Sequence, residues 1–458
     1  MEPTPGHAAP SRLDAYFALT QRGTTVRKEI LAGATTFVTM AYILFVNPQI
    51  LGAAAGPGRA GALLTSTALV AAVMTLAMGL AANLPLALAP GMGLNAVVAF
   101  QLVGGARLTY AEAMGVIVAE GIVITLLVVT GLRQTIVRAV PLALKRAIAI
   151  GIGLFLALIG CKNAGFVSAG GGLLTLGDGG RLHGFPVALF AITLLFTAWL
   201  VVRNVRGALL IGMAASTAVA VLARALFGGA GFAPHVAELP HALVAAPDFS
   251  LVGQFSFGFI HALGPTAAIL AVFSIMLSDF FDTVGTVVAV GQEAKYLDER
   301  GNFPRPGAVL LVDSLAAAVG GAVGASSATT YIESASGAAA GGRTGLTSVV
   351  TGALFALCLL VSPLAGVVPP QATGAILVLV GFLMMREVGA IRWDEPADAI
   401  PAFLTLAVMP FTYSITDGIG AGFVSYVTLR LLAGHVRELH PLMIASALAF
   451  VVYFAFGG

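Results

Sequence analysis

Charged residues are scarce in this sequence. Only 10% of its 458 residues are Asp, Glu, Lys or Arg, whereas a soluble domain carries roughly 25%. The formal net charge of +2 is too small to indicate a nucleic-acid partner. The two cysteines, Cys161 and Cys358, have no spacing that a metal or redox site would need. The composition therefore excludes an ordinary water-soluble domain and gives no sign of a metal site or of nucleic-acid binding.

Apolar residues make up 58% of the chain, and they form runs long enough to cross a bilayer. Two of the runs, 92–104 and 332–340, are too short to span a hydrocarbon core of about 30 Å alone. The sequence thus predicts an all-α polytopic membrane protein. The predicted helices cover residues 29–51, 62–83, 92–104, 111–131, 143–160, 184–202, 207–227, 263–291, 306–324, 332–340, 345–364, 371–388, 397–415, 418–433 and 440–456.

Basic residues are unevenly distributed along the chain. They cluster before the first predicted helix and after the fourth, sixth and eighth, and none lies between Arg224 and Lys295. The positive-inside rule then places the N-terminal segment, 1–28, in the cytoplasm and the loop 228–262 outside the cell. We therefore expect a multi-pass protein of the cell membrane with a cytoplasmic N-terminus.

One segment is repeated half a chain later. The sequence VPLALKRAIAIGIGLFL (140–156) is similar to VPPQATGAILVLVGFLM (368–384), so that Pro141 matches Pro369 and Gly153 matches Gly381 at an offset of 228. If an odd number of helices separates the copies, the two halves insert with opposite topology. Inverted repeats of this kind are typical of secondary transporters, which bind their substrate at the repeat interface.

Both short helices follow sequence that disfavours a continuous helix. The first such stretch is NLPLALAPGMGLNAVVAFQL (83–102), and the second is VGASSATTYIESASGAAAGG (323–342). Non-helical backbone inside a membrane is tolerated only where it is buried in protein or lines a cavity. Asn95 and Glu333 lie at the starts of the two half-helices, where free backbone amides favour acceptor groups. These stretches are therefore candidates for a binding site.

The stretch SDFFDTVGT (278–286) places acids inside an apolar run. Asp279, Asp282 and Thr286 are spaced to share one face of a helix. An ionised side chain at the bilayer centre costs on the order of 2.5–3.5 kcal/mol, so we expect this face to line a polar cavity. The alternative, which stays open above all for Asp279, is a carboxyl group that only bonds neighbouring backbone or hydroxyl groups.

Four stretches resemble the AzgA-like branch of the nucleobase–cation symporter-2 family. They are GATTFVTMAYILFVNPQIL (33–51), APGMGLNAVVAF (89–100), SDFFDTVGTVVAVGQEA (278–294) and SSATTYIESASGAAAGGRTGL (326–346). The resemblance implies a proton-coupled permease for purine nucleobases, adenine and/or hypoxanthine and guanine, that works by an elevator-like alternating-access mechanism. It also implies a homodimer and no cofactor, with H⁺ as the coupling ion.

The fold implied by this resemblance has fourteen helices in a seven-plus-seven inverted repeat, with two unwound half-helices that form short β-strands at the midplane. A core domain moves against a gate domain. On this chain the resemblance assigns the cytoplasmic segment to 1–28, the core domain to 29–131 and 263–364, the gate domain to 132–227 and 365–458, and the extracellular loop to 228–262.

The resemblance also assigns the site residue by residue. The acid of helix 8 falls on Asp282, the acid of helix 10 on Glu333 and the asparagine of helix 3 on Asn95. We expect these three, with Thr330 and Thr286, to bind the base. Asp282, Glu333 and Asp279 are the candidates for proton coupling. The uracil branch tends to carry a histidine where this chain has Thr286, so coupling schemes that depend on that histidine do not transfer.

Other functions remain to be weighed against this one. A uracil or xanthine symporter, or another small-solute carrier of the same fold, is the alternative. An anion carrier should present Arg or neutral donors rather than acids. An intramembrane enzyme would need an embedded Ser–His pair, an HExxH motif or catalytic aspartates on separate helices, whereas Asp279 and Asp282 share one helix. We therefore predict a carrier in the bilayer and not an enzyme; a channel would differ by lacking saturable uptake.

Overall fold

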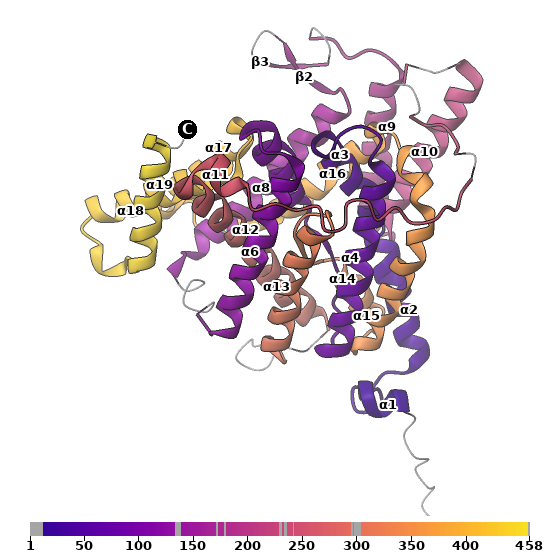
Figure 1. The fold of residues 1–458 in the computed structure, drawn as a ribbon, viewed down its shortest axis with the longest axis horizontal. Helices are drawn as coiled ribbons and strands as arrows, with labels where there is room; N and C mark the ends of the chain where they lie inside the picture. The colour runs from indigo at the N-terminus through magenta and orange to yellow at the C-terminus, as the bar shows by residue number, and fades with distance from the viewer. Residues whose placement is uncertain are drawn as a thin grey trace, which may run out of the picture.

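The structure is a computed structural model built almost entirely of helices (Figure 1). Helices α18 and α19 lie at one side of the molecule, and α9 and α10 lie at the opposite side (Figure 1). The loops 133–138 and 297–303, which contain some of the basic residues used for the orientation, are outside the described residues. The structure describes residues 12–132, 139–170, 173–177, 180–228, 231–232, 236–240, 242–294, 296 and 304–456.

The first half of the chain begins with a short helix and continues through seven apolar segments. Its elements are α1 (Arg12–Phe17), α2 (Val26–Met40), α3 (Ile43–Ala55), α4 (Ala60–Ala81), β1 (Leu88–Pro90), α5 (Met92–Ala96), the π-helix η1 (Val97–Gly105), α6 (Tyr110–Val129), α8 (Leu142–Asn163), β2 (Val167–Gly170), β3 (Leu173–Leu176), α9 (Phe185–Val202) and α10 (Ala208–Phe227).

The second half also has long helices interrupted by a strand and a short helix, β4 and α14, which correspond to β1 and α5 of the first half. Its elements are α11 (Phe259–Leu263), α12 (Pro265–Glu293), α13 (Pro306–Ala322), β4 (Ala328–Thr330), α14 (Ser334–Ala339), α15 (Gly345–Leu357), the 3₁₀ helix η2 (Cys358–Gly366), α16 (Pro370–Met384), the 3₁₀ helix η3 (Met385–Ala390), α17 (Pro396–Thr412), α18 (Ile415–Leu432), the 3₁₀ helix η4 (Val436–Glu438) and α19 (Pro441–Phe456).

One predicted helix is interrupted in the structure. The first predicted span, 29–51, is divided into α2 and α3 at Ala41 and Tyr42, where the amide of Leu44 bonds the carbonyl of Ala41 over a tight turn. Pro48 follows this turn and lies inside α3, where its missing N–H leaves the carbonyl of Leu44 without its helical partner. The predicted span 263–291 is present as one continuous helix, α12, and Gly264, with φ of 76°, separates its start from the short helix α11.

The two short strands that the resemblance implied are present, and they pair with each other. β1 and β4 are antiparallel, with Leu88 opposite Thr330 and Pro90 opposite Ala328. Each strand precedes a short helix, α5 or α14, as the two unwound stretches predicted. All six strand residues are buried, which agrees with the rule that irregular backbone in such a protein is enclosed by other segments.

The inverted repeat is visible where α8 crosses α16. A Cβ atom added to Gly153 would lie 2.8 Å from the carbonyl oxygen of Gly381, and Gly160 meets Gly374 in the same way. The residue numbers of the contacting glycines increase along α8 and decrease along α16, so the two helices are antiparallel. Gly153 contacts its own repeat partner at the offset of 228, so a pseudo-two-fold axis passes between them. The predicted fold class is therefore confirmed.

A second pair of strands was not predicted. β2 and β3 form an antiparallel hairpin between α8 and α9, with Ser168 opposite Thr175. The hydropathy analysis assigned this stretch to a loop, because runs of four residues are too short to stand out from their Gly-rich surroundings. Figure 1 shows the hairpin at one end of the helical bundle, and it forms a sheet separate from that of β1 and β4.

Candidate functional site

The predicted site segments meet around the β1–β4 ribbon. β1 leads through Gly91 into α5, and β4 leads through Tyr331 and Glu333 into α14. Helix α12 packs against α5, β4 and α14. Segments as far apart in the sequence as residues 88 and 330 are therefore neighbours, and the predicted residues lie on α5, α12, β4 and the start of α14.

Glu333 immediately precedes α14 and is half-buried. The hydroxyl of Tyr42 donates a hydrogen bond of 2.6 Å to Oε1 of Glu333. Tyr42 is fully buried and lies at the break between α2 and α3. The break in the first span therefore places the hydroxyl of Tyr42 where it can donate a hydrogen bond to Glu333 of the second unwound stretch.

Asp282 lies on α12, and its side chain is exposed although Asp279 and Thr283 beside it are buried. Its carboxyl group interacts electrostatically with those of Glu333 and Asp313. The accessible surface of Asp282 therefore belongs to the face of α12 that is turned toward the acids of the neighbouring segments. Asp282 and Glu333 therefore interact with each other where α12 contacts α14.

Asn95 and Thr330 carry polar atoms without partners. Asn95 on α5 has no exposed surface, and neither its Oδ1 nor its Nδ2 has a hydrogen-bond partner among the described residues. The same holds for Oγ1 of Thr330 on β4, which is 1% exposed. Buried polar atoms are nearly always hydrogen-bonded, so these atoms indicate a place for water or a ligand.

The predicted face of α12 is only partly turned toward this site. Asp279 is 1% exposed and Thr286 is 5% exposed, in contrast to Asp282. Of the three residues spaced along the predicted face, Asp282 is the one that the structure presents to an accessible space. The roles of Asp279 and Thr286 remain predictions.

Asp313 was missed in the sequence, although it holds the ribbon in place. This carboxyl group on α13 is fully buried and accepts hydrogen bonds from the amide of Thr330 at 3.1 Å and from the hydroxyl of Thr283 at 2.7 Å. It therefore joins β4 to α12 next to Asp282. An acid inside the apolar run 306–324 was the available signal, the same signal that identified Asp282. Tyr42 had no comparable signal.

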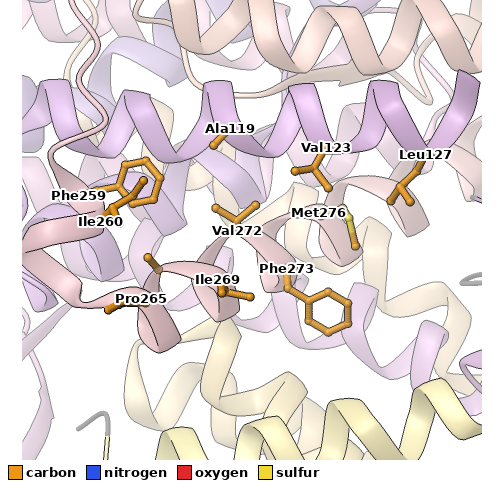
Figure 2. Close-up of a pocket in the computed structure, with 11 residues that line it drawn as sticks. Ala119, Val123, Leu127, Phe259, Ile260, Pro265, Ile269, Val272, Phe273 and Met276 are labelled. Atoms are coloured by element: carbon orange, nitrogen blue, oxygen red, sulfur yellow. The ribbon is translucent and has the colours of Figure 1, made fainter.

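A separate cavity of about 520 Å³ lies between α6 and α12 (Figure 2). Its wall consists of apolar side chains, including Val123 and Leu127 on α6 and Val272, Phe273 and Met276 on α12. None of the predicted site residues lines it. A ligand with polar edges would find no hydrogen-bond partner there, so this cavity is not a site for such a ligand. Among the described residues no cluster of His, Cys, Asp and Glu suited to a metal ion is found.

Known proteins are similar to this chain over nearly its whole length. Residues 27–420 match the model of the Permease family. The adenine permease AdeP of Escherichia coli (strain K12) is 40% identical over 97% of this chain and 96% of its own length. The guanine/hypoxanthine permease PbuO of Bacillus subtilis (strain 168) is 41% identical over 95% of this chain and 99% of its own length.

Solved structures share the fold at low sequence identity. The transmembrane domain of the cyanobacterial bicarbonate transporter BicA aligns with a TM-score of 0.62 and 16% identity, covering 86% of this chain and 97% of that domain. Eight described helical segments are long and apolar enough to cross a membrane. The chain is therefore a multi-pass membrane protein and a member of this permease family, the nucleobase–cation symporter-2 family whose motifs its sequence carries.

Proposed function

We propose that this protein is a proton-coupled permease that takes purine nucleobases into the cell. The observation that carries the proposal is the interaction of the acids Asp282 and Glu333, on segments that contact those of Asn95 and Thr330, whose buried polar atoms have no partner among the described residues. Relatives at about 40% identity are named adenine permease and guanine/hypoxanthine permease, which supports a purine as the substrate.

The proposed site matches the edges of a purine. A purine base is flat and uncharged, with N–H donors and ring-nitrogen or carbonyl acceptors along its rim. The carboxylates of Glu333 and Asp282 accept from N–H groups, while Nδ2 of Asn95 donates to an acceptor and its Oδ1 receives a further N–H. The hydroxyl of Thr330 serves in either role. A bound base thus satisfies the atoms that the protein leaves unpaired.

A proton supplies the driving force in this proposal. Two carboxylates close together are more stable when one of them carries a proton, because like charges repel strongly in a site of low dielectric constant. One proton crossing the membrane potential yields about 2.3 kcal/mol per 100 mV, which corresponds to roughly 50-fold accumulation of base. Proton binding outside and release inside would couple this energy to uptake.

The proposed movement is of the elevator type in a homodimer within the cell membrane, with the N-terminus in the cytoplasm. The expected core domain contains the β1–β4 ribbon, Asp282 and Glu333, and the expected gate domain contains α8 and α16–α19. Gln101 of the core segment donates a hydrogen bond of 2.5 Å to Oγ1 of Thr416 in the gate segment. Such a bond must break when the two domains slide.

The test is uptake of radiolabelled adenine and hypoxanthine into proteoliposomes with an imposed pH gradient. Competition by unlabelled adenine, guanine, hypoxanthine, xanthine and uracil defines the substrate. Glu333→Gln and Asp282→Asn should lose uptake or its pH dependence, whereas Glu112→Gln, at an acid in the exposed first turn of α6, serves as the control. Wild-type uptake and pH dependence in both site variants would refute the mechanism, and competition by uracil alone would refute the substrate.

A further inference from the structure

A buried acid that the proposed site does not use, Glu120, is hydrogen-bonded to the residue that precedes β4. Glu120, in the middle of α6, has no exposed surface. Its Oε2 accepts a hydrogen bond from the hydroxyl of Ser327 at 3.3 Å, and its Oε1 has no partner among the described residues. Ser327 directly precedes β4. A carboxyl group with a single long hydrogen bond is thus attached to the strand that carries Thr330.

The described helices that pack against the helix of Glu120 carry no Lys or Arg. These helices are α13, α12, η1 and α11. Asp313 on α13 is the group that interacts electrostatically with Glu120. The other titratable residues on these helices are Asp279, Asp282 and Glu293 on α12 and His261 on α11.

The two buried acids differ in how well a negative charge is accommodated. Asp313 accepts hydrogen bonds from the amide of Thr330 and from the hydroxyls of Thr283 and Thr329. Glu120 has only the hydroxyl of Ser327. An ionised carboxylate that is buried without a cation is far more costly than a neutral acid in the same place. The negative charge is therefore best placed on Asp313 and the proton on Glu120.

We propose that Glu120 is a proton-binding site and a positioning residue for β4, separate from the acids that face the substrate. When Glu120 holds its proton, Ser327 and Asp313 keep β4 in the observed register. When the proton leaves, two carboxylates repel each other across the residues 327–330, and the ribbon that carries Thr330 and leads to Glu333 is displaced. The effect on uptake rests on the proposed function, whereas the protonation of Glu120 does not.

The first measurement needs no substrate. Infrared spectra of the purified full-length protein in lipid at neutral pH should contain the carbonyl band of a protonated carboxylic acid that Glu120→Gln removes. Glu112→Gln, on the same helix but in its exposed first turn, should keep the band. Ser327→Ala leaves Glu120 in place and removes its hydrogen-bond partner, so it should shift the band without removing it, and it serves if Glu120→Gln does not fold. A band that none of these variants changes would refute protonation of Glu120.

The second measurement is the pH profile of nucleobase uptake. Gln is permanently neutral and nearly the same shape, so Glu120→Gln should retain uptake at acidic pH. Its decline toward alkaline pH should begin at a higher pH than in the wild type, because only the proton of the substrate-facing acids then remains to be lost. If the infrared band is lost but the pH profile equals that of the wild type, Glu120 holds a structural proton and the positioning role is refuted. If the wild type itself takes up no nucleobase, the proposed function fails, while the infrared result still decides the protonation of Glu120.

Discussion

The hydrogen bond between Gln101 and Thr416 should bias the protein toward the conformation described here. Gln101 lies on the π-helical segment η1 of the expected core domain, and Thr416 lies in the first turn of α18 in the expected gate domain. Nε2 of Gln101 donates to Oγ1 of Thr416 at 2.5 Å, and the amide of Thr416 reaches Oε1 of Gln101 at 3.5 Å. The second contact is at the limit of a hydrogen bond, so we count one bond.

One neutral hydrogen bond contributes about 0.5–1.5 kcal/mol net. Removing it with Gln101→Leu or Thr416→Val should therefore lower the population of this conformation relative to its alternative by about 2- to 13-fold. Because both variants remove the same bond, the double variant should show little further change. This non-additivity distinguishes a direct interaction from two independent effects.

The assay is a distance distribution between one spin label on the expected core domain and one on the expected gate domain, in protein whose two native cysteines are replaced. Ser425→Ala is the matched control, because this residue also lies on α18 but its hydroxyl bonds only carbonyls of its own helix. Populations that stay unchanged in both single variants, or effects that simply add in the double variant, would refute this role of the bond.

Three further predictions concern single contacts. Tyr42→Phe removes the hydroxyl that donates to Glu333. Because a hydrogen bond to a charged group contributes about 1.5–3 kcal/mol, uptake at limiting substrate should fall about 10-fold or more. An unchanged KM would contradict this prediction. Glu29→Ala leaves five donors at the start of α15 without their acceptor. Thermal unfolding in detergent should therefore show that the free energy of unfolding falls by more than about 3 kcal/mol. A smaller decrease would mean that water replaces the carboxylate. Gly153→Val places a side chain against the carbonyl of Gly381 and should destabilise the α8–α16 contact by about 1–3 kcal/mol in the same assay. The control is Gly52→Ala, because open space surrounds the Cβ atom that this substitution adds.

The sequence was sufficient where a rule of membrane insertion applies to each segment separately. Hydropathy located the long helices, and Gly and Pro around residues 83–102 revealed the first unwound stretch. The sequence was insufficient where a residue's role depends on contacts with segments that are distant in the chain. Tyr42 is an ordinary aromatic residue until the break after α2 brings it to Glu333. The pairing of β1 with β4 joins segments that are far apart in the sequence (88 opposite 330, and 330 − 88 = 242), and nothing in either segment alone specifies the other.

The rule that an acid inside an apolar span indicates a site applies to more residues than the sequence analysis selected. An acid in an apolar span drew attention to Asp282, yet Glu120 in VIVAEGIVIT and Asp313 in LLVDSLAAA satisfy the same rule. The spacing of Asp279 with Asp282 on one helix face was the more obvious pattern. In the structure the acids from different helices interact: Asp313 acts on both Glu120 and Asp282. A search for every acid inside a span, with no regard to spacing, would have found all of them.

The contacts also separate the two acids that we propose to face the substrate. Glu333 accepts a hydrogen bond from Tyr42, and a donor of this kind stabilises a carboxylate that must accept from a base. Asp282 accepts no hydrogen bond from the described residues and interacts with two other acids, so a proton benefits it more. We therefore expect Glu333→Gln to lose substrate binding at every pH and Asp282→Asn to keep binding but lose its pH dependence. Binding to purified protein, measured by calorimetry across a pH series, separates these outcomes; the reverse pattern would assign the proton to Glu333.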